Sequence, residues 1–186
     1  MTGLRIIGGK VRGFHLKDVP GDSTRPITDM VKESLFNILG PDIEDAVFWD
    51  LFGGTGSVGI ESLSRGAAFV TFSDKNRNAI NTLRFNLEHT GFTAQSKVIF
   101  GDAFSLLRQK ADRVFDYIYV APPQYKEMWK ETIMIIDDNI DNLSLDGWVI
   151  VQIHPKEYEQ LQLNHLAQFD ERKYGNTLLV FYERKK

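Results

Sequence analysis

Apolar residues recur along the chain in short blocks with two alternating spacings. Runs rich in β-branched and aromatic residues predict buried strands, at 46–51, 69–73, 98–100, 117–121 and 148–153. Helical spacing of apolar residues predicts helices between them, at 58–65, 76–89, 104–110, 126–139 and, briefly, 156–161. Repeated strand–helix units indicate an α/β fold with a mainly parallel sheet and helices on both faces. The runs 168–174 and 177–183 predict a closing hairpin about Gly175-Asn176, and therefore one antiparallel strand.

One more helix is predicted ahead of the first strand. Its apolar positions run from Met30 to Leu39 at helical spacing, with Lys32 and Glu33 expected on its polar face. Thr28 or Asp29 is a suitable N-cap. Gly40-Pro41 is expected to end the helix.

The first 22 residues differ from the rest and are expected to form a small basic unit. The β-type runs 4–7 and 11–16, around Gly8-Gly9, predict a hairpin. Residues 1–17 contain four basic and no acidic residues, although the whole chain has a net charge of −3. The four are Arg5, Lys10, Arg12 and Lys17. Solvated chain ends would explain this pattern, and so would a surface that faces phosphates.

Length and composition limit the class of protein. A chain of 186 residues with 42% hydrophobic residues can bury a full core in a single main domain, here 23–186. Because the chain has no cysteine, disulfide scaffolds, thiolate zinc sites and cysteine nucleophiles are excluded. No apolar run approaches the ~18 residues of a membrane span. The sequence therefore predicts a cytoplasmic monomer without a metal or a membrane partner.

An acidic residue follows each of the first three predicted strands: Asp50, Asp74 and Asp102. In an open parallel sheet, ligands bind beyond these carboxyl ends. Gly54 to Gly59 also match the dinucleotide pattern G-x-G-x-x-G, which favours a nicotinamide oxidoreductase as one alternative. Asp50 opposes that alternative, because a carboxylate across the glycine loop would repel a pyrophosphate.

The three acids instead favour S-adenosylmethionine, which carries a sulfonium and an ammonium group. Its carboxylate would lie at the helix N-terminus after Gly56. Asp74 would bind the ribose hydroxyls, and Asp102 the adenine amino group beside the Ala103 amide. The remaining candidates for the cofactor site flank these residues: Phe52, Gly53, Gly54, Thr55 and Lys75.

The fourth strand is followed by Ala121-Pro122-Pro123-Gln124-Tyr125. Two prolines fix the backbone, so that the flanking carbonyls become rigid acceptors. Amine-directed methyltransferases have Asp or Asn, then Pro-Pro, then Tyr or Phe at this place. Acceptors there draw the hydrogens of an exocyclic NH₂ and free its lone pair, while the aromatic ring stacks on the base.

Together these features resemble the bacterial methyltransferases that modify a guanine N2 in 16S ribosomal RNA. The segments that carry the resemblance extend over most of the chain: 5–13, 24–29, 32–37, 50–61, 64–67 and 174–177. The resemblance implies a Rossmann-like, seven-stranded class I methyltransferase fold with a small N-terminal β-hairpin that contacts RNA. It also implies that Arg25 and Thr28 lie over the cofactor, and that the substrate is ribosomal RNA or a small-subunit assembly particle.

The chain departs from the family at the substrate end. Ala121 replaces the Asp or Asn, Gln124 replaces the aromatic residue, and Tyr125 comes one position late. Either the carbonyls of Ala121 and Pro122 suffice, or Gln124 supplies the missing oxygen, or the activity differs. DNA adenine-N6 methylation and a catalytically weakened RNA-binding relative therefore stay open as alternatives.

Two other groups of polar residues are expected to be structural. The four histidines have no spacing typical of a metal or nucleophilic site. Asp137, Asp138 and Asp141 are expected on a solvated helix end.

Overall fold

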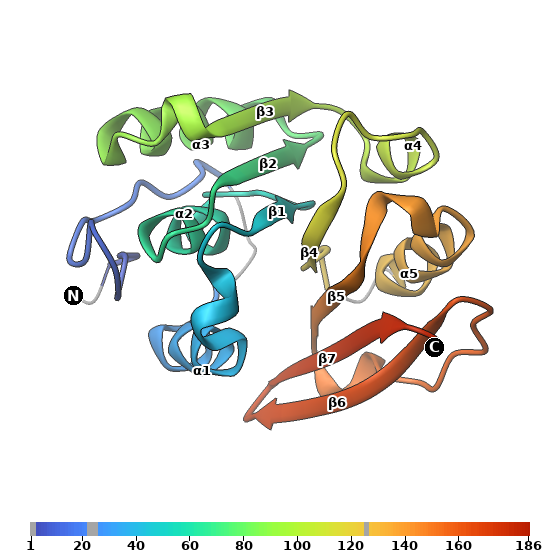
Figure 1. The fold of residues 1–186 in the computed structure, drawn as a ribbon. Helices are drawn as coiled ribbons and strands as arrows, with labels where there is room; N and C mark the ends of the chain where they lie inside the picture. Colours follow the sequence, from blue (N-terminus) through green and yellow to red (C-terminus); the bar gives the residue numbers. More distant parts are fainter. Residues whose placement is uncertain (1–2, 22–25, 125–126) are drawn as a thin grey trace.

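The computed structural model of the protein describes residues 3–21, 26–124 and 127–186. They fold around one seven-stranded sheet of order β3-β2-β1-β4-β5-β7-β6 (Figure 1). The strands are β1 (Val47–Asp50), β2 (Phe69–Asp74), β3 (Ser96–Phe100), β4 (Phe115–Val120), β5 (Leu143–Ile153), β6 (Leu166–Tyr174) and β7 (Thr177–Arg184). The α-helices are α1 (Asp29–Leu39), α2 (Ser57–Ser64), α3 (Arg77–Thr90), α4 (Ala103–Leu107) and α5 (Met128–Asp138). The fold expected from the sequence is confirmed in its strands and in these five helices.

Strand direction brings the expected site residues to one edge of the sheet. Strands β1 to β5 pair in parallel, whereas β7 is antiparallel to both β5 and β6. Asp50 is in register with Phe72 of β2 and with Tyr119 of β4. The carboxyl ends of β1, β2 and β4 therefore lie next to one another.

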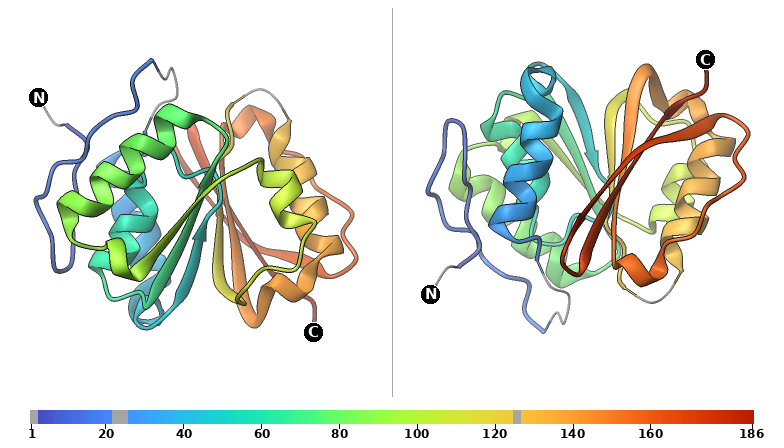
Figure 2. Two further views of the ribbon diagram at one scale, coloured as in Figure 1. Left: turned by 90° about the horizontal axis from the view of Figure 1, so that it is seen from above. Right: turned by 90° about the horizontal axis from the view of Figure 1, so that it is seen from below.

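Each face of the sheet is covered by its own set of helices (Figure 2). Consecutive residues of β1 alternate between the faces: Phe48 packs with α1, α2 and α3, and Trp49 packs with α4 and α5. This alternation is the period-2 geometry of a strand buried on both sides. Because both faces are covered, the edge formed by the strand ends remains for a ligand.

The predicted helix ends are confirmed at three places. The Thr28 side chain accepts a hydrogen bond from the Val31 amide and caps α1. Gly40 and Gly91 follow α1 and α3 with φ of 58° and 79°, values that glycine adopts without steric cost.

The N-terminal segment, residues 3–21, does not form the expected two-stranded hairpin. It folds back on itself through an isolated Arg5–His15 bridge and a few backbone bonds, such as Leu16 N–H to Leu4 C=O. Near Gly8-Gly9, side chains of α2 bind backbone groups of Ile7, Gly8 and Val11. Its Ile6 and Leu16 are buried in the same core as α1 to α3.

Three further expectations are wrong. The segment 156–161 contains only a 3₁₀ turn at Pro155–Glu157. Lys32 is fully buried rather than on a polar face, because it pairs with Glu61. Asp137 is also buried, because its carboxylate accepts the backbone N–H groups of Asn164, His165 and Leu166.

Candidate active site

A cavity of about 800 Å³ opens at the carboxyl ends of the strands. Its size lies within the roughly 300–1,000 Å³ of small-molecule sites. Most of the expected site residues line it: Asp50, Phe52, Gly53, Gly54, Thr55, Asp74, Lys75, Asp102, Ala103, Ala121, Pro122, Pro123 and Gln124. The structure thus brings the predicted cofactor and substrate ends into one space.

The glycine loop joins β1 to α2 in a tight turn. The Gly53 amide bonds to the Ser73 carbonyl at 2.8 Å, and Gly56 precedes α2 in the left-handed conformation with φ 81°. A Cβ on Gly59 would lie 2.3 Å from the Phe72 ring, so this glycine lets α2 pack on β2. Ser57 and Val58, in the first turn of α2, line the cavity. The dipole of the helix N-terminus favours an anionic ligand group, although the Ser57 amide already donates to the Thr55 hydroxyl and the Gly59 amide to Asp50.

Asp50 is among the residues that line the cavity, and 2% of its surface is exposed. Its Oδ2 accepts the Gly59 amide at 3.1 Å. Burial raises the pKa of the Asp50 carboxyl well above its usual range, the Gly59 hydrogen bond lowers it, and the charge of Asp74 raises it further. A cationic ligand at this point would favour the ionised form. Asp50 thus fits a ligand with positive charge.

Asp74 and Asp102 have backbone partners as well as access to the cavity. The Asp74 carboxylate accepts the amides of Gly54 at 3.0 Å and Asn76 at 2.8 Å. The Asp102 carboxylate caps α4 through the Ser105 amide at 3.0 Å. These bonds orient both carboxylates, whose other lone pairs can accept from hydroxyl or amino groups of a ligand.

The cavity lining also contains polar residues that the sequence did not single out. Tyr119, Gln152 and Thr177 line it beside Pro122 and Gln124. The Tyr119 hydroxyl donates to Gln152 Oε1. Burial, and then the charge of Asp50, raise the pKa of Tyr119 well above its usual range, so that it stays a neutral donor. The sequence does give one indication of two of these residues: Tyr119 and Gln152 are polar and stand near the ends of apolar strands.

The segment ahead of α1 also reaches the cavity. Asp18, Val19, Pro26 and Ile27 line it. Thr28, expected at the cofactor, has its hydroxyl at the N-cap of α1. Arg25 and Tyr125 lie outside the described residues.

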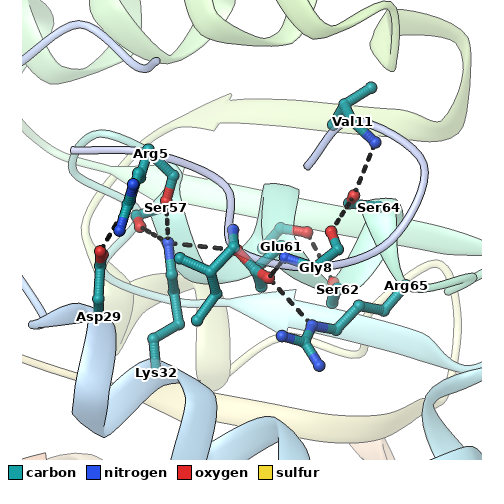
Figure 3. Close-up of polar contacts among 12 residues, drawn as sticks. Arg5, Gly8, Val11, Asp29, Lys32, Ser57, Glu61, Ser62, Ser64 and Arg65 are labelled. Atoms are coloured by element: carbon teal, nitrogen blue, oxygen red, sulfur yellow. Dashed lines mark hydrogen bonds and ion pairs between the residues drawn. The ribbon is translucent and has the colours of Figure 1, made fainter. Parts of the chain in front are cut away.

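The N-terminal segment is held on the helices by buried polar groups (Figure 3). Both carboxylate oxygens of Glu61 accept backbone amides, from Ile7 at 3.1 Å and Gly8 at 2.9 Å. The Lys32 amine donates to the Arg5 carbonyl and to the Ser57 hydroxyl. A Cβ on Gly9, which has φ 76°, would lie 1.9 Å from the Ser64 carbonyl oxygen, so only glycine allows this approach. The backbone of the segment is therefore fixed relative to α1 and α2.

The basic side chains that are expected to contact RNA lie on the solvent-exposed surface of this segment. Arg5, Lys10, Arg12 and Lys17 are all at least partly exposed. Arg5 forms an ion pair with Asp29 at 2.9 Å. Their backbone is anchored while their side chains face solvent.

Membrane spans and metal clusters are both absent from the described residues. Within 3–21, 26–124 and 127–186, no helix combines the length and apolar character needed to cross a membrane. The same residues contain no group of three or more His, Asp or Glu side chains placed to hold a metal ion.

The strand order, the antiparallel β7 and the acid-lined cavity beyond β1 define a class I methyltransferase fold. The chain belongs to the family described as Conserved hypothetical protein 95, which matches residues 4–183.

Named relatives agree with this assignment. "Putative rRNA methyltransferase YlbH" of Bacillus subtilis is 36% identical over 185 residues, covering 98% of this chain and 100% of the relative. "Ribosomal RNA small subunit methyltransferase D" of Escherichia coli K12 is 39% identical over 146 residues, covering 78% and 69%. A solved structure, "Putative methyltransferase yhhF from Escherichia coli", superposes with a TM-score of 0.86 at 33% identity and covers 98% of both chains. The family resemblance predicted from the sequence is confirmed.

Proposed function

We propose that this protein transfers a methyl group from S-adenosylmethionine to the exocyclic amine of a nucleobase, N2 of a guanine in small-subunit ribosomal RNA. The observation that carries the proposal is the shared cavity that joins three strand-end carboxylates to the Pro122-Pro123 turn. The small-subunit RNA methyltransferases among the relatives support the choice of substrate. We further propose that the protein acts as a cytoplasmic monomer on the RNA or on an assembly particle.

Each part of the cavity has a proposed role in binding the cofactor. Asp50 faces the cationic end, and the N-terminus of α2 faces the carboxylate. Asp74 accepts from the ribose hydroxyls, and Asp102, with the Ala103 amide, faces the adenine ring. Gly53, Gly54, Gly56 and Thr55 let the backbone approach closely, while Phe52 and Lys75 complete the wall. Arg25 and Thr28 are proposed contacts from the segment ahead of α1.

When bound, the cofactor would supply an electrophilic methyl group, which would pass to the amine nitrogen as its carbon–sulfur bond breaks, with one amine proton lost to solvent. Acceptors at the end of β4, from the carbonyls of Ala121 and Pro122 and the side chain of Gln124, orient the NH₂ group. Pro123 keeps this turn rigid, and Tyr125 is the proposed stacking partner of the base.

The proposal is tested by methyl transfer to undermethylated small-subunit RNA, with mass mapping of the product. Methylation of one guanine at N2 is the expected result. Methylation of adenine in DNA would replace the substrate assignment. RNA binding without methylation of naked RNA or assembly particles would favour the alternative that the protein is a catalytically weakened RNA-binding relative. The observation that supports this alternative is that the Ala121 side chain has no hydrogen-bond acceptor.

A further inference from the structure

Three aromatic rings lie in a row on the surface between the N-terminal segment and α3. The centroid of the Phe14 ring is 5.4 Å from that of His89. The His89 ring is 6.1 Å from that of Phe85 and nearly parallel to it, at 13°. Phe14 is 40% exposed and Phe85 is 52% exposed. We refer to Phe14, His89 and Phe85 as the ring row.

Phe85 does not belong to the hydrophobic core. The buried positions of α3 include Ile80, Leu83 and Leu87, which face the sheet, whereas Phe85 lies on the opposite, charged face. Isolated exposed apolar residues are ordinary. A row of three rings built from two separate segments is not an isolated residue, and such patches mark interaction sites.

Positive charge accompanies the rings. The Lys17 amine lies 5.2 Å from the centroid of the Phe85 ring. Arg84, beside Phe85 on α3, is also exposed. Glu88 and Asp18 are the acidic neighbours in sequence. Lys17, whose amine lies against the Phe85 ring, and Arg84 therefore offer cationic contacts to an anionic partner that carries flat apolar groups.

Asn86 connects the ring row to the cavity. Its side-chain oxygen accepts the Lys17 amide at 2.8 Å, and its nitrogen donates to the Lys17 carbonyl at 3.0 Å and the Thr55 carbonyl at 2.8 Å. Thr55 and Asp18 line the cavity. Asn86 thus joins Lys17, whose amine lies against the Phe85 ring, to Thr55 of the proposed cofactor site, and the views of Figure 2 place the N-terminal segment alongside α3.

We propose that the ring row is a stacking platform for an unpaired base of the RNA substrate, with Phe85 as the main stacking ring and Lys17 against a neighbouring phosphate. Aromatic side chains bind bases of any sequence through their π faces, and adjacent cations bind the backbone. A target base that leaves its stack interrupts the pairing around it, so unpaired neighbours lie close to the cavity. This inference rests on the proposed function and adds a surface to it.

The test compares Phe85→Leu with the wild type on two labelled probes, by fluorescence anisotropy. One probe is a single-stranded oligoribonucleotide, and the other is an abasic oligomer with the same number of phosphates. Phe85→Leu should weaken binding of the RNA by about fivefold or more, since a stacked base contributes at least this much. Binding of the abasic oligomer should stay unchanged, and Phe85→Tyr should restore RNA affinity.

Salt dependence separates stacking from charge. Phe85→Leu should leave the slope of log affinity against log salt unchanged. Lys17→Gln should reduce it by about 0.7 for both probes. Phe169→Leu is the matched control, because Phe169 is 39% exposed and lies 4.9 Å from the Trp148 ring, but belongs to β6 at the other end of the sheet. It should bind both probes as the wild type does.

Several results would overturn the platform. One is an RNA affinity of Phe85→Leu equal to that of the wild type, and another is an equal loss of affinity for both probes. A third is binding of the abasic oligomer by the wild type as tightly as RNA. Sedimentation that showed a dimer, dissociated by Phe85→Leu with RNA affinity intact, would assign the surface to a second copy. If the stacking pattern holds but no ribosomal RNA is methylated, the proposed function fails and the platform stands.

Discussion

The amine of Lys32 lies 3.2 Å from a carboxylate oxygen of Glu61, and both side chains are completely buried. Burial lowers the pKa of Lys32 below its usual value, and the negative charge of Glu61 offsets part of this shift. Glu61 also binds Arg65 at 2.9 Å. This pair joins α1 to α2 beneath the N-terminal segment (Figure 3).

Removal of one member of the pair should destabilise the protein. Glu61→Gln leaves the Lys32 charge without its counter-ion, at a cost of about 3–5 kcal/mol in the free energy of unfolding. Lys32→Met together with Glu61→Gln should cost less than the sum of the single changes, since no unpaired buried charge remains from the pair. Denaturant unfolding measures both, with the exposed Lys110→Met as a control that should change little. Additive losses would contradict the coupling.

The three strand-end acids predict the ligand. The protein should bind S-adenosylmethionine and its demethylated product, and Asp74→Ala should weaken both strongly. Since Asp74 also accepts the Gly54 and Asn76 amides, Asp74→Asn is the milder companion. Calorimetry checks this, and tight binding of NAD with no response to S-adenosylmethionine would overturn the assignment.

The raised pKa of Asp50 predicts how binding depends on pH. Since a cation favours the ionised carboxylate, S-adenosylmethionine binding should release a proton and tighten as pH rises through the raised pKa. Without ligand, the free energy of unfolding should fall as pH rises towards the raised pKa of Asp50. The reason is that the folded protein still holds a proton on this carboxyl that the unfolded chain has released. Asp50→Asn should weaken binding and flatten both profiles, because it removes the carboxyl whose pKa is raised. Calorimetry in two buffers of different ionisation enthalpy measures the proton directly.

The proposed substrate end of the cavity predicts a contrast between two variants, Gln124→Ala and Ala121→Asp. If Gln124 supplies the acceptor that Ala121 lacks, Gln124→Ala should lower the rate by about ten- to a thousandfold. Ala121→Asp should keep or raise the rate, because it restores an acceptor at the position the motif uses. Single-turnover methyl transfer on one RNA compares them. If wild type and Ala121→Asp were both inactive on every form of ribosomal RNA while S-adenosylmethionine still bound, the guanine-amine assignment would fail.

The basic side chains of the N-terminal segment predict how RNA binding depends on salt concentration. Lys10→Ala with Arg12→Ala should weaken RNA binding whatever the sequence. The double variant should also reduce the salt slope by about 0.7 for each phosphate that the two side chains bind on a single strand. Cofactor affinity should stay the same, because neither residue lines the cavity. An unchanged RNA affinity in this double variant would remove the cations from the interface.

Local patterns were enough for the frame of the molecule. Strand–helix alternation predicted the parallel sheet, and the pair Gly175-Asn176 predicted the antiparallel end. Because parallel strands end on one side, the positions of Asp50, Asp74 and Asp102 after their strands already implied a shared site. The glycine loop and the Pro-Pro turn could also be assigned from the sequence, because the backbone conformation of each depends on adjacent residues.

Long-range packing decided the rest. Lys32 was predicted on a polar face, yet α2 brings Glu61 against it, 29 positions away in the sequence. Asp137 was predicted to be solvated, yet it holds the backbone of residues 164–166. The N-terminal runs were predicted to form strands, yet side chains of α2 bind the backbone of Ile7, Gly8 and Val11. The ring row required Phe14 and Phe85 to meet across two segments. The sequence by itself determined the elements, their order and the acids at the strand ends, since those depend on neighbours along the chain. Only the tertiary structure decided which charges are buried and which surfaces form, because those depend on partners far apart in sequence.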